Sequence, residues 1–512
     1  MQGMERQDRK LLDAAALVGH LVPEGSMFAF LATHRGQVFP DEQFADLFPS
    51  GRGRPSLPAP VAAAVLTLQS LYDLSDAETA EAARCDLRWK VATGMALDDK
   101  GFHPSTLTYW RQRLARSARP HRINDAVKKV VEETGILAGR RRRAVDSTIL
   151  ADAAAKTAAV CTGHDYATPG KPQIDWDDPQ AKDALVSALV NDAGALLAAL
   201  DDAELDEQAQ TAVALLALVA GQDVEPAEGS DGTDGRWRIA RKVAPDRVIS
   251  TVDPDARHTR KSPENRRDGY RAHVAAEPQT GIITDEELTR AAGADNSDPA
   301  VAERFVAAET TQAIPDPQPA ADSDARVLEW YGDSAYGTGE LRDAIAGAGH
   351  AAVLKPKPLQ AAVEGGFTVD DFTVDHQAGT VGCPAGHTRP ISATGVATFG
   401  ALCRACPLRQ QCTTCKTGRK IVLHAHDTLL RQARRDWAAD PRLRDDYRQH
   451  RPNVERVISQ LASRGGRRLK LRYLGVAANN AWLKRRTAAL NLRNLIGRGL
   501  TRRDGTWALA TT

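Results

Sequence analysis

The order in which apolar strands alternate with helices is the feature that most constrains the fold of this chain. An apolar strand over 143–150 carries an aspartate, and two strands at 271–277 and 282–288 flank the tight turn Pro278-Gln-Thr-Gly281. The later expected elements are a helix over 297–308, a strand over 326–331, a helix over 338–348, a strand over 351–354 and an amphipathic helix that begins near Arg451. We predict an α+β or α/β fold, with a mixed sheet flanked by helices, because such an alternation packs as a helix-covered sheet.

The length of the chain indicates more than one domain. A chain of 512 residues exceeds what one hydrophobic core usually organises. We expect a helical N-terminal domain at 1–135, a larger mixed domain at 136–500 and a tail at 501–512. Two segments interrupt the larger domain: an acidic helical insert at 153–240 and a cysteine-rich insertion at 360–425.

The composition does not indicate a membrane protein. The hydrophobic share is 42%, and the sequence has no uninterrupted run of about 18 apolar residues. The first ten residues carry no signal-peptide pattern. We therefore expect a cytoplasmic protein without a membrane partner.

The net charge of +1 conceals two blocks of opposite sign. Residues 171–235 contain 15 Asp and Glu but 2 Lys and Arg, whereas residues 441–504 contain 17 Lys and Arg but 4 Asp and Glu. A clustered positive field attracts a polyanion and gains entropy from released counterions. The C-terminal block is therefore the better candidate for contact with DNA.

Residues 57–116 have a helical pattern. Ser75 and Glu78 form a capping-box signature at the start of one helix, and another helix begins at Ser105. The exposed face of that second helix would present Thr106, Tyr109, Arg113 and Arg116. Two interpretations stay open: a DNA-binding unit that resembles a helix-turn-helix, and an ordinary helical bundle with a solvated basic face.

Basic residues gather in two further places. A strip near the C-terminus contains Arg467, Arg468, Lys470, Arg472, Lys484, Arg485 and Arg486. A charge run is usually a solvated face, but we predict that this strip contacts the DNA backbone, which positions DNA without reading its sequence. For the run at 140–143, a phosphate clamp and an exposed linker are both open.

Three carboxylates far apart in sequence lie in settings that suit a metal site. Asp146 and Asp333 belong to apolar strands or their ends, and we place Glu455 at the opening of the late helix. Acids brought together repel one another unless divalent cations neutralise them, and hard cations prefer oxygen ligands. Two such ions about 3.5 to 4 Å apart can stabilise the entering and leaving oxygens of a displacement at phosphorus. Each acid also has a structural interpretation: a turn cap through Ser147, a strand-end turn and a helix N-terminus.

The sequence around these acids resembles bacterial insertion-sequence transposases of the DDE type. The blocks that carry the resemblance are 102–107, 247–258, 268–274, 327–337 and 451–456. The resemblance implies an N-terminal transposase domain followed by a ribonuclease H-like catalytic domain. In that domain Asp146, Asp333 and Glu455 would bind Mg²⁺ or Mn²⁺, as two ions, and Arg451 would neutralise phosphate charge. It further implies double-stranded DNA as partner, both transposon ends and target, and a homodimer or larger synaptic assembly.

The match to that group is partial around the last acid. Arg451 stands at the expected position, four residues before the glutamate. Tyr447 stands one residue early, and Arg448 occupies the place of the expected tyrosine. Ala462 occupies the expected basic position, with Arg464 two residues later. The resemblance therefore carries over Arg451 but not the auxiliary tyrosine and basic residue.

Five of the seven cysteines fall between residues 383 and 415. Such clustering favours zinc over disulfides in a reducing cytosol, because thiolates hold Zn²⁺ tetrahedrally. The candidates for a structural Zn²⁺ are Cys383, Cys403, Cys406, Cys412 and Cys415, with His387 nearby. The first four also match a cysteine-bearing insertion of the resembled group. A reduced cluster without metal is the alternative, and we expect Cys85 and Cys161 to take no part.

These expectations point to a DNA transposase. It would bind the terminal inverted repeats of an insertion sequence and catalyse metal-dependent strand cleavage and strand transfer. Two alternatives stay open: a catalytically silent DNA-binding or zinc regulator descended from such an enzyme, and a ribonuclease H-like nuclease without strand transfer.

Overall fold

The computed structural model describes most of the chain. The described residues are 1–4, 12–50, 53, 55–152, 174–201, 203–241, 247–250, 252–260, 266–312 and 327–510. Cys161, the beginning of the expected acidic insert and Arg326 lie outside these residues.

Helices build the N-terminal part of the chain. They are α1 (Ala14–Val18), α2 (Met27–Val38), α3 (Ala59–Tyr72), α4 (Asp76–Cys85), α5 (Leu87–Thr93), α6 (Ser105–Ala115) and α7 (Arg122–Glu133). Helix α3 is buried from Ala59 to Leu71 and forms the centre of this unit. The capping box is confirmed, since the Glu78 amide donates to Ser75 Oγ and the Ser75 amide donates to the Glu78 carboxylate.

A mixed sheet forms the middle of the molecule. Its strands are β1 (Arg142–Asp152), β4 (Arg257–Arg260), β5 (Arg266–Ala276), β6 (Ile283–Arg290), β7 (Glu329–Gly332), β8 (Ala351–Leu354) and β16 (Lys470–Leu471). The order is β4-β5-β1-β7-β8, with β6 paired to β5 and β16 paired to β1. Strand β5 runs antiparallel to β1, whereas β7 and β16 run parallel to β1. The predicted mixed sheet is therefore confirmed.

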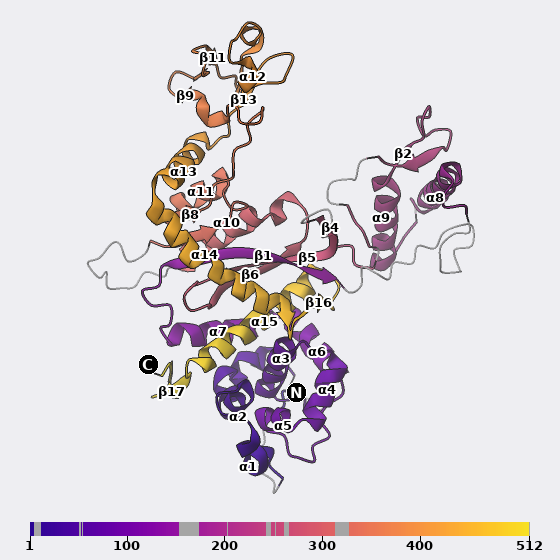
Figure 1. The fold of residues 1–512 in the computed structure, drawn as a ribbon. Coiled ribbons are helices and arrows are strands. Elements are labelled where there is room, and N and C mark those ends of the chain that lie inside the picture. The colour runs from indigo at the N-terminus through magenta and orange to yellow at the C-terminus, as the bar shows by residue number, and fades with distance from the viewer. Residues whose placement is uncertain are drawn as a thin grey trace.

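Helices cover both faces of this sheet (Figure 1). They are α14 (Pro441–Ala462) and α15 (Val476–Gly497) on one face, and α10 (Asp298–Gln312) and α11 (Gly339–Gly347) on the other. Successive residues of a strand point to opposite faces. Accordingly, Ala144 belongs to the core with Val454 of α14, and Val145 to the core with Val301 of α10.

Helix α15 joins the N-terminal helices to the sheet. It packs against β6 and also against α3 and α7. The N-terminal helices and the α14 face of the sheet therefore share one hydrophobic core, which runs across the domain boundary that we expected at residue 135.

The C-terminal segment forms a hairpin where a tail was expected. Its strands are β17 (Thr501–Arg503) and β18 (Thr506–Ala508). Trp507 is buried against Phe30 and His34 of α2, so aromatic packing fixes this end of the chain.

The helix that carries Glu455 starts earlier than predicted. Helix α14 begins at Pro441, where Asp440 caps it through the Arg442 amide. Pro452 lies inside the helix, although its sequence setting suggested a first helical turn. The expectation that Glu455 opens a helix was wrong, because the helix runs through this proline.

The acidic insert projects away from the sheet (Figure 1). It contains α8 (Pro179–Leu200), α9 (Glu207–Gln222), β2 (Val224–Pro226) and β3 (Trp237–Ile239). By length and composition alone, α8 is the one described helix that could cross a membrane, and it has no buried residue. Lys182, Asp183 and Asp192 interrupt its apolar sequence.

The cysteine-rich segment forms a lobe at the end of the molecule opposite to the N-terminal helices (Figure 1). Its elements are β9 (Thr373–Asp375), β10 (Thr380–Gly382), β11 (Thr388–Pro390), β12 (Val396–Thr398), α12 (Arg409–Cys412) and β13 (Lys420–Val422). Phe372, Val381, Phe399 and Ile421 are buried in a small core of its own. Helix α13 (Asp427–Ala439) connects this lobe to α14.

Candidate functional site

Asp146 lies at a gap along one edge of β1. Strand β7 pairs with β1 only over Arg142–Ala144, and β16 pairs with it only at Ala151 and Asp152. Between these pairings no described strand flanks that edge of β1. Because Asp146 has the same parity as Ala144, its side chain points to the face that α14 covers.

Asp333 reaches the same gap from the neighbouring strand. Strand β7 is parallel to β1 and ends at Gly332, so the residue that follows it lies beside the open part of β1. A Cβ at Gly332 would lie 2.7 Å from Tyr336 Cβ, which explains the glycine before the turn.

Glu455 approaches from α14, and a single guanidinium group connects it to both aspartates. Arg451 Nη2 lies 3.2 Å from Asp146 Oδ2 and 3.6 Å from Asp333 Oδ2, and its Nη1 lies 3.6 Å from Glu455 Oε1. Arg451 precedes Glu455 by one helical turn, so both side chains share one face of α14. The structure therefore brings together all four residues that the sequence singles out.

Burial, one arginine and two carboxylates all act on the pKa of Asp146. Burial raises the pKa of Asp146, Arg451 lowers it, and the carboxylates of Asp333 and Glu455 raise it again. Burial also raises the pKa of Tyr447, which lies close enough to the cluster for all four charges to act on it. Tyr447 is thus beside the acids, although it stands one position away from the expected place.

A second layer of polar contacts lies behind Asp146 and was not predicted. Ser147 Oγ donates to Asp298 Oδ1 at 2.7 Å, and Arg271 Nη1 donates to the same oxygen at 3.3 Å. His273 Nδ1 lies 3.5 Å from it. Asp298 is the first residue of α10, and the sequence signal for it was the helix start that we assigned to Ser297.

The cluster fits hard divalent cations by its chemistry. Three carboxylates face one arginine, so the acids outnumber the positive charge beside them, and oxygen donors are what Mg²⁺ and Mn²⁺ prefer. Arg451 Nε is buried without a hydrogen-bond partner among the described residues, so the guanidinium is only partly satisfied there. As the side chains stand, no three described His, Cys, Asp or Glu residues lie close enough to hold a metal ion.

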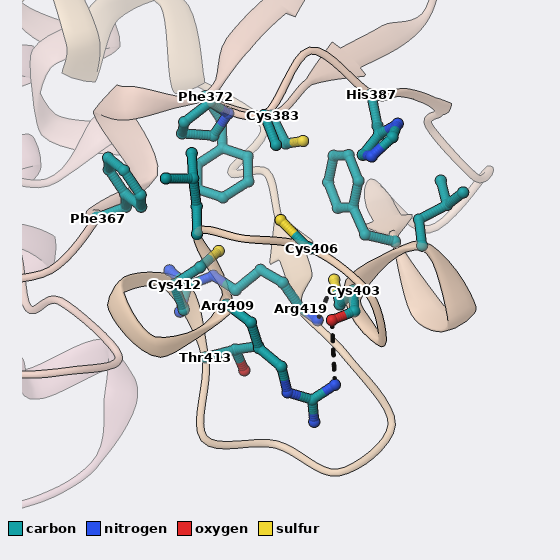
Figure 2. Close-up of a pocket in the computed structure, with 15 residues that line it drawn as sticks. Phe367, Phe372, Cys383, His387, Cys403, Cys406, Arg409, Cys412, Thr413 and Arg419 are labelled. Carbon is teal, nitrogen blue, oxygen red and sulfur yellow. Dashed lines mark hydrogen bonds between the residues drawn. The ribbon is translucent and has the colours of Figure 1, made fainter.

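Four of the five candidate zinc ligands line one pocket in the cysteine-rich lobe (Figure 2). They are Cys383, Cys403, Cys406 and Cys412, and His387 lines the same pocket. The Arg419 amide donates to Cys403 Sγ at 3.4 Å. Burial raises the pKa of Cys412, and the three neighbouring sulfurs raise it further.

Cys415 differs from the other four cysteines. It is exposed, lies outside the residues that line the pocket and contacts Thr417 Oγ1 at 3.2 Å. Of the five candidate ligands, Cys415 is therefore the one that lies apart from the pocket.

The basic strip divides into an exposed and a buried part. Arg467, Arg468, Lys470 and Arg472 are exposed, and Arg472 contacts Asp73 and Glu78 of the N-terminal unit. Strands β14 (Ser463–Arg464) and β15 (Arg467–Arg468) form a tight hairpin around Gly465 and Gly466. Both glycines have positive φ, as a two-residue hairpin turn requires.

Arg485 and Arg486 are buried and cannot contact DNA, so these two predictions were wrong, whereas Lys484 is half-buried. Arg486 is 2% exposed, and its guanidinium donates to Ser70, Gln460 and Leu461 carbonyl oxygens at the C-terminal ends of α3 and α14. Arg485 is 6% exposed, and Lys484 pairs with the buried Glu286 at 3.1 Å. Lys484, Arg485 and Arg486 form a charge run in the sequence although most of α15 is buried. Arg486 is tolerated there because it donates to carbonyl groups of neighbouring helices, and Lys484 because it pairs with the buried Glu286.

The arginine run at 140–143 overlaps the start of β1, and three of its members have polar partners. Arg142 lies 3.2 Å from Glu329, Arg143 lies 2.5 Å from Glu309, and Arg140 donates to Gln279. These pairs fix β1 to its neighbours.

On α6, the expected face is accessible. Tyr109 is 65% exposed, and Arg113 and Arg116 are also exposed. The Arg113 guanidinium lies 4.4 Å from the centre of the Phe48 ring.

Comparisons with known proteins find transposase domains in two separate segments of the chain. Residues 382–496 match a family described as "Transposase DDE domain", and residues 18–113 match one described as "Transposase domain (DUF772)". No curated protein matches the chain. One solved structure, a cryo-EM structure of the piggyBac transposase synaptic complex with hairpin DNA, is similar with 8% identity and a TM-score of 0.32, over 98% of this chain and 79% of that one. At that TM-score the structural likeness carries no argument.

Proposed function

Because the chain is a DNA transposase of the DDE type, we propose that Asp146, Asp333 and Glu455 are its catalytic triad. The observation that carries the proposal is the contact of one guanidinium group with all three acids. Acids that are remote in sequence have no structural reason to share one arginine, whereas a cation-binding site requires such convergence.

The topology supports a ribonuclease H-like catalytic domain. Two acids come from adjacent parallel strands of a mixed sheet, and the third comes from a helix packed on the same face. Two of the acids lie outside the segment that matches the DDE domain, so this part rests on geometry alone.

Each residue of the cluster has a task in DNA cleavage. Mg²⁺ or Mn²⁺, when bound, supplies charge stabilisation and lowers the pKa of a water molecule. Asp146 and Asp333 offer carboxylate oxygens from rigid strands, and Glu455 completes the set from α14. Arg451 balances negative charge that collects at the phosphate, and Asp298 holds Ser147 and so orients the backbone beside Asp146.

The reaction has two displacements at phosphorus. In the first, a water oxygen forms a bond to the scissile phosphorus and the bond to the 3′-oxygen breaks, which leaves a 3′-hydroxyl on the transposon end. In the second, that hydroxyl attacks a phosphate of the target and displaces its 3′-oxygen. Both steps transfer one proton away from the attacking oxygen.

DNA would be held on both sides of this cluster. The exposed arginines and lysine of the β14–β16 region would contact the phosphate backbone, and the N-terminal helices would bind the terminal repeats. Two ends must be joined in one assembly, so we propose a homodimer or larger synaptic complex that acts in the cytoplasm on chromosomal DNA.

Strand cleavage of a duplex tests the triad. The substrate is taken from the DNA that flanks the coding region, and cleavage is followed with Mg²⁺ or Mn²⁺. Asp146→Asn, Asp333→Asn and Glu455→Gln should each lower the rate by roughly 10²- to 10⁴-fold, since a bound metal ion contributes several kcal/mol to the transition state. Asp445→Asn is the matched control, because Asp445 is a 70% exposed acid on the same helix.

The products separate the alternatives. Normal cleavage by Asp333→Asn would remove the assigned role of this residue. DNA binding without any metal-dependent cleavage would favour a silent regulator. Nicked DNA without joined products would favour a nuclease.

For the cysteine-rich lobe we propose a structural Zn²⁺ held by Cys383, Cys403, Cys406 and Cys412. Four thiols around one small pocket are the donor set that Zn²⁺ prefers, and a backbone amide already donates to one sulfur. Metal analysis of protein purified under reducing conditions should find one Zn²⁺ per chain.

Two cysteine-to-serine variants, one inside the pocket and one outside it, test the proposed zinc ligands. Cys403→Ser should lose the zinc, and Cys415→Ser should retain it, because Cys415 lies outside the pocket. Zinc-free wild-type protein, or equal loss in both variants, would contradict the proposed ligand set.

A further inference from the structure

A groove extends from Glu455 along the sheet. It has a volume of about 600 Å³. One wall is the face of α14 that carries Glu455, Ile458, Ser459 and Ala462, and the opposite wall is β1 from Thr148 to Ala151. The chain from Ser463 to Lys470 closes its far end, and Arg267 and Asp268 of β5 lie at its side. The groove therefore begins at the proposed triad and leads away from it.

The groove is lined by two kinds of side chain. Ile149, Ile458 and Leu469 give it an aliphatic lining. Basic groups belong to its other walls: Arg468 and Lys470, both exposed, and Arg267. Such a combination suits a ligand that is apolar on one side and anionic on the other.

From this lining we infer that the groove binds one unpaired DNA strand, the nucleotides next to the phosphate that the triad cuts. A paired duplex keeps its bases stacked inside and presents mainly phosphates, so it would leave the aliphatic lining unused. An unpaired strand offers base faces to the lining and phosphates to the basic groups. The volume lies in the range of about 300–1,000 Å³ that holds small-molecule ligands, which corresponds to one or two nucleotides.

The helical wall of the groove sets the length of strand that it can hold. Ser459 follows Glu455 by one turn of α14, and Ala462 by two turns, so the groove spans about 10 Å from the acid at 1.5 Å per residue. Asp268 and Glu455 are the acidic groups in the lining, and the basic groups outnumber them. The inference rests on the proposed function, because it assigns to the groove the strand on which the triad acts.

Binding without divalent metal tests the groove apart from the chemistry. The probes are a fluorescent blunt duplex and the same duplex with a four-nucleotide single-stranded extension, titrated with protein in EDTA. The wild-type protein should bind the extended duplex about tenfold more tightly than the blunt one, because the unpaired bases would bury apolar surface against Ile149, Ile458 and Leu469.

A variant that fills the groove gives the decisive comparison. Ser459 is exposed and its side chain makes no hydrogen bond in the described structure, so Ser459→Trp should fill the groove with little effect on the fold. It should bring the affinity ratio of the two probes close to one. Gln449→Trp is the control, because it places the same ring on an exposed position of α14 outside the groove.

The binding results test the groove separately from the proposed catalytic role of the three acids. Loss of the ratio in Ser459→Trp but not in Gln449→Trp, with unchanged thermal unfolding, supports the groove. Equal affinity of the wild-type protein for both probes, or an unchanged ratio in Ser459→Trp, overturns it. Because EDTA removes the divalent metal, neither outcome depends on whether Asp146, Asp333 and Glu455 catalyse cleavage.

Discussion

Arg451 is the residue on which the geometry of the acids depends. It is 5% exposed and is the only side chain in the described structure that pairs with all three acids. A buried guanidinium beside three carboxylates acts as an internal cation. It holds the acids near one another and limits their repulsion.

Removing this cation should destabilise the metal-free protein. Arg451→Ala leaves three carboxylates without a counter-charge. Asp146 is the most buried of them, whereas Asp333 and Glu455 are 46% and 68% exposed, so we expect a loss of roughly 1–3 kcal/mol. We expect a lower melting temperature in EDTA and a larger rise on addition of Ca²⁺ than the wild-type protein shows, because bound cations would replace the arginine. A melting temperature that Ca²⁺ does not raise more than in the wild type would contradict this role.

Two arginines of the basic strip should respond in opposite ways to the same substitution. Arg486→Ala leaves carbonyl groups at two helix ends unsatisfied and should lower the free energy of unfolding by about 2–4 kcal/mol. Arg467→Ala removes an exposed charge, so it should leave stability unchanged and reduce the salt dependence of DNA binding by about one phosphate contact. Denaturant unfolding and affinity at several salt concentrations measure both effects. The assignment fails if Arg486→Ala unfolds like the wild type.

At the scale of single residues, the sequence identifies the residues of the candidate site better than it predicts which side chains are buried. Asp146, Asp333, Glu455 and Arg451 were identified from local context, and the structure brings them together. Arg485 and Arg486 look the same as Arg467 in sequence. Only the packing of α15 against α3 and α14 decides that they are inside.

Among the elements, the antiparallel pair β5 and β6 contains the group with the clearest pH dependence. His273 on β5 is 1% exposed, and its Nε2 contacts Thr289 Oγ1 of β6 at 3.1 Å. Burial, together with the charges of Arg271 and Arg304, lowers its pKa to about 3. Within the described part of the chain, Asp298 is the acid paired with the ring, at 3.5 Å from Nδ1.

The sign of the effect follows from the two protonation equilibria. The unfolded chain takes up a proton at His273 below its ordinary pKa near 6.5, whereas the folded protein resists protonation down to about pH 3. The stabilising contribution is therefore fully present above pH 6.5 and is lost as the pH falls towards 3. His273→Gln should flatten the pH dependence of unfolding in this window, by an amount on the order of a few kcal/mol. A slope equal to that of the wild type would show that other groups dominate.

The elements themselves were largely predictable because their periodicity is strong. The hairpin β5–β6, the strand β8 and the helices α6 and α11 appear where the apolar pattern places them. The start of α14 was missed because a proline inside a helix gives the same local signal as a proline at its first turn. The β16 pairing with β1 was missed because two residues are too few to show a period.

At the scale of the whole molecule, the described residues form three separate hydrophobic cores. One runs from the N-terminal helices through α15 to the sheet, a second lies under α10 and α11, and the third belongs to the cysteine-rich lobe. The sequence could not predict that the N-terminal helices share the first core, because the contacts of α15 with α3 and α7 join segments remote in sequence.

The separate core of the lobe leads to a prediction about zinc removal. If Zn²⁺ stabilises the lobe, a chelator should increase amide hydrogen exchange over residues 367–423 while β1 and β5 stay protected. Cooperative loss of protection in the sheet as well would show that the lobe is part of the main folding unit. Hydrogen exchange with mass spectrometry resolves these two outcomes.

The most direct test of the catalytic site is the position of Mn²⁺ in crystals of the protein bound to an uncleaved DNA end. Anomalous scattering locates manganese independently of the protein model. We expect peaks within about 2.0–2.3 Å of carboxylate oxygens of Asp146, Asp333 and Glu455. Manganese at another set of side chains, in crystals that cut the DNA when warmed, would contradict the proposed triad.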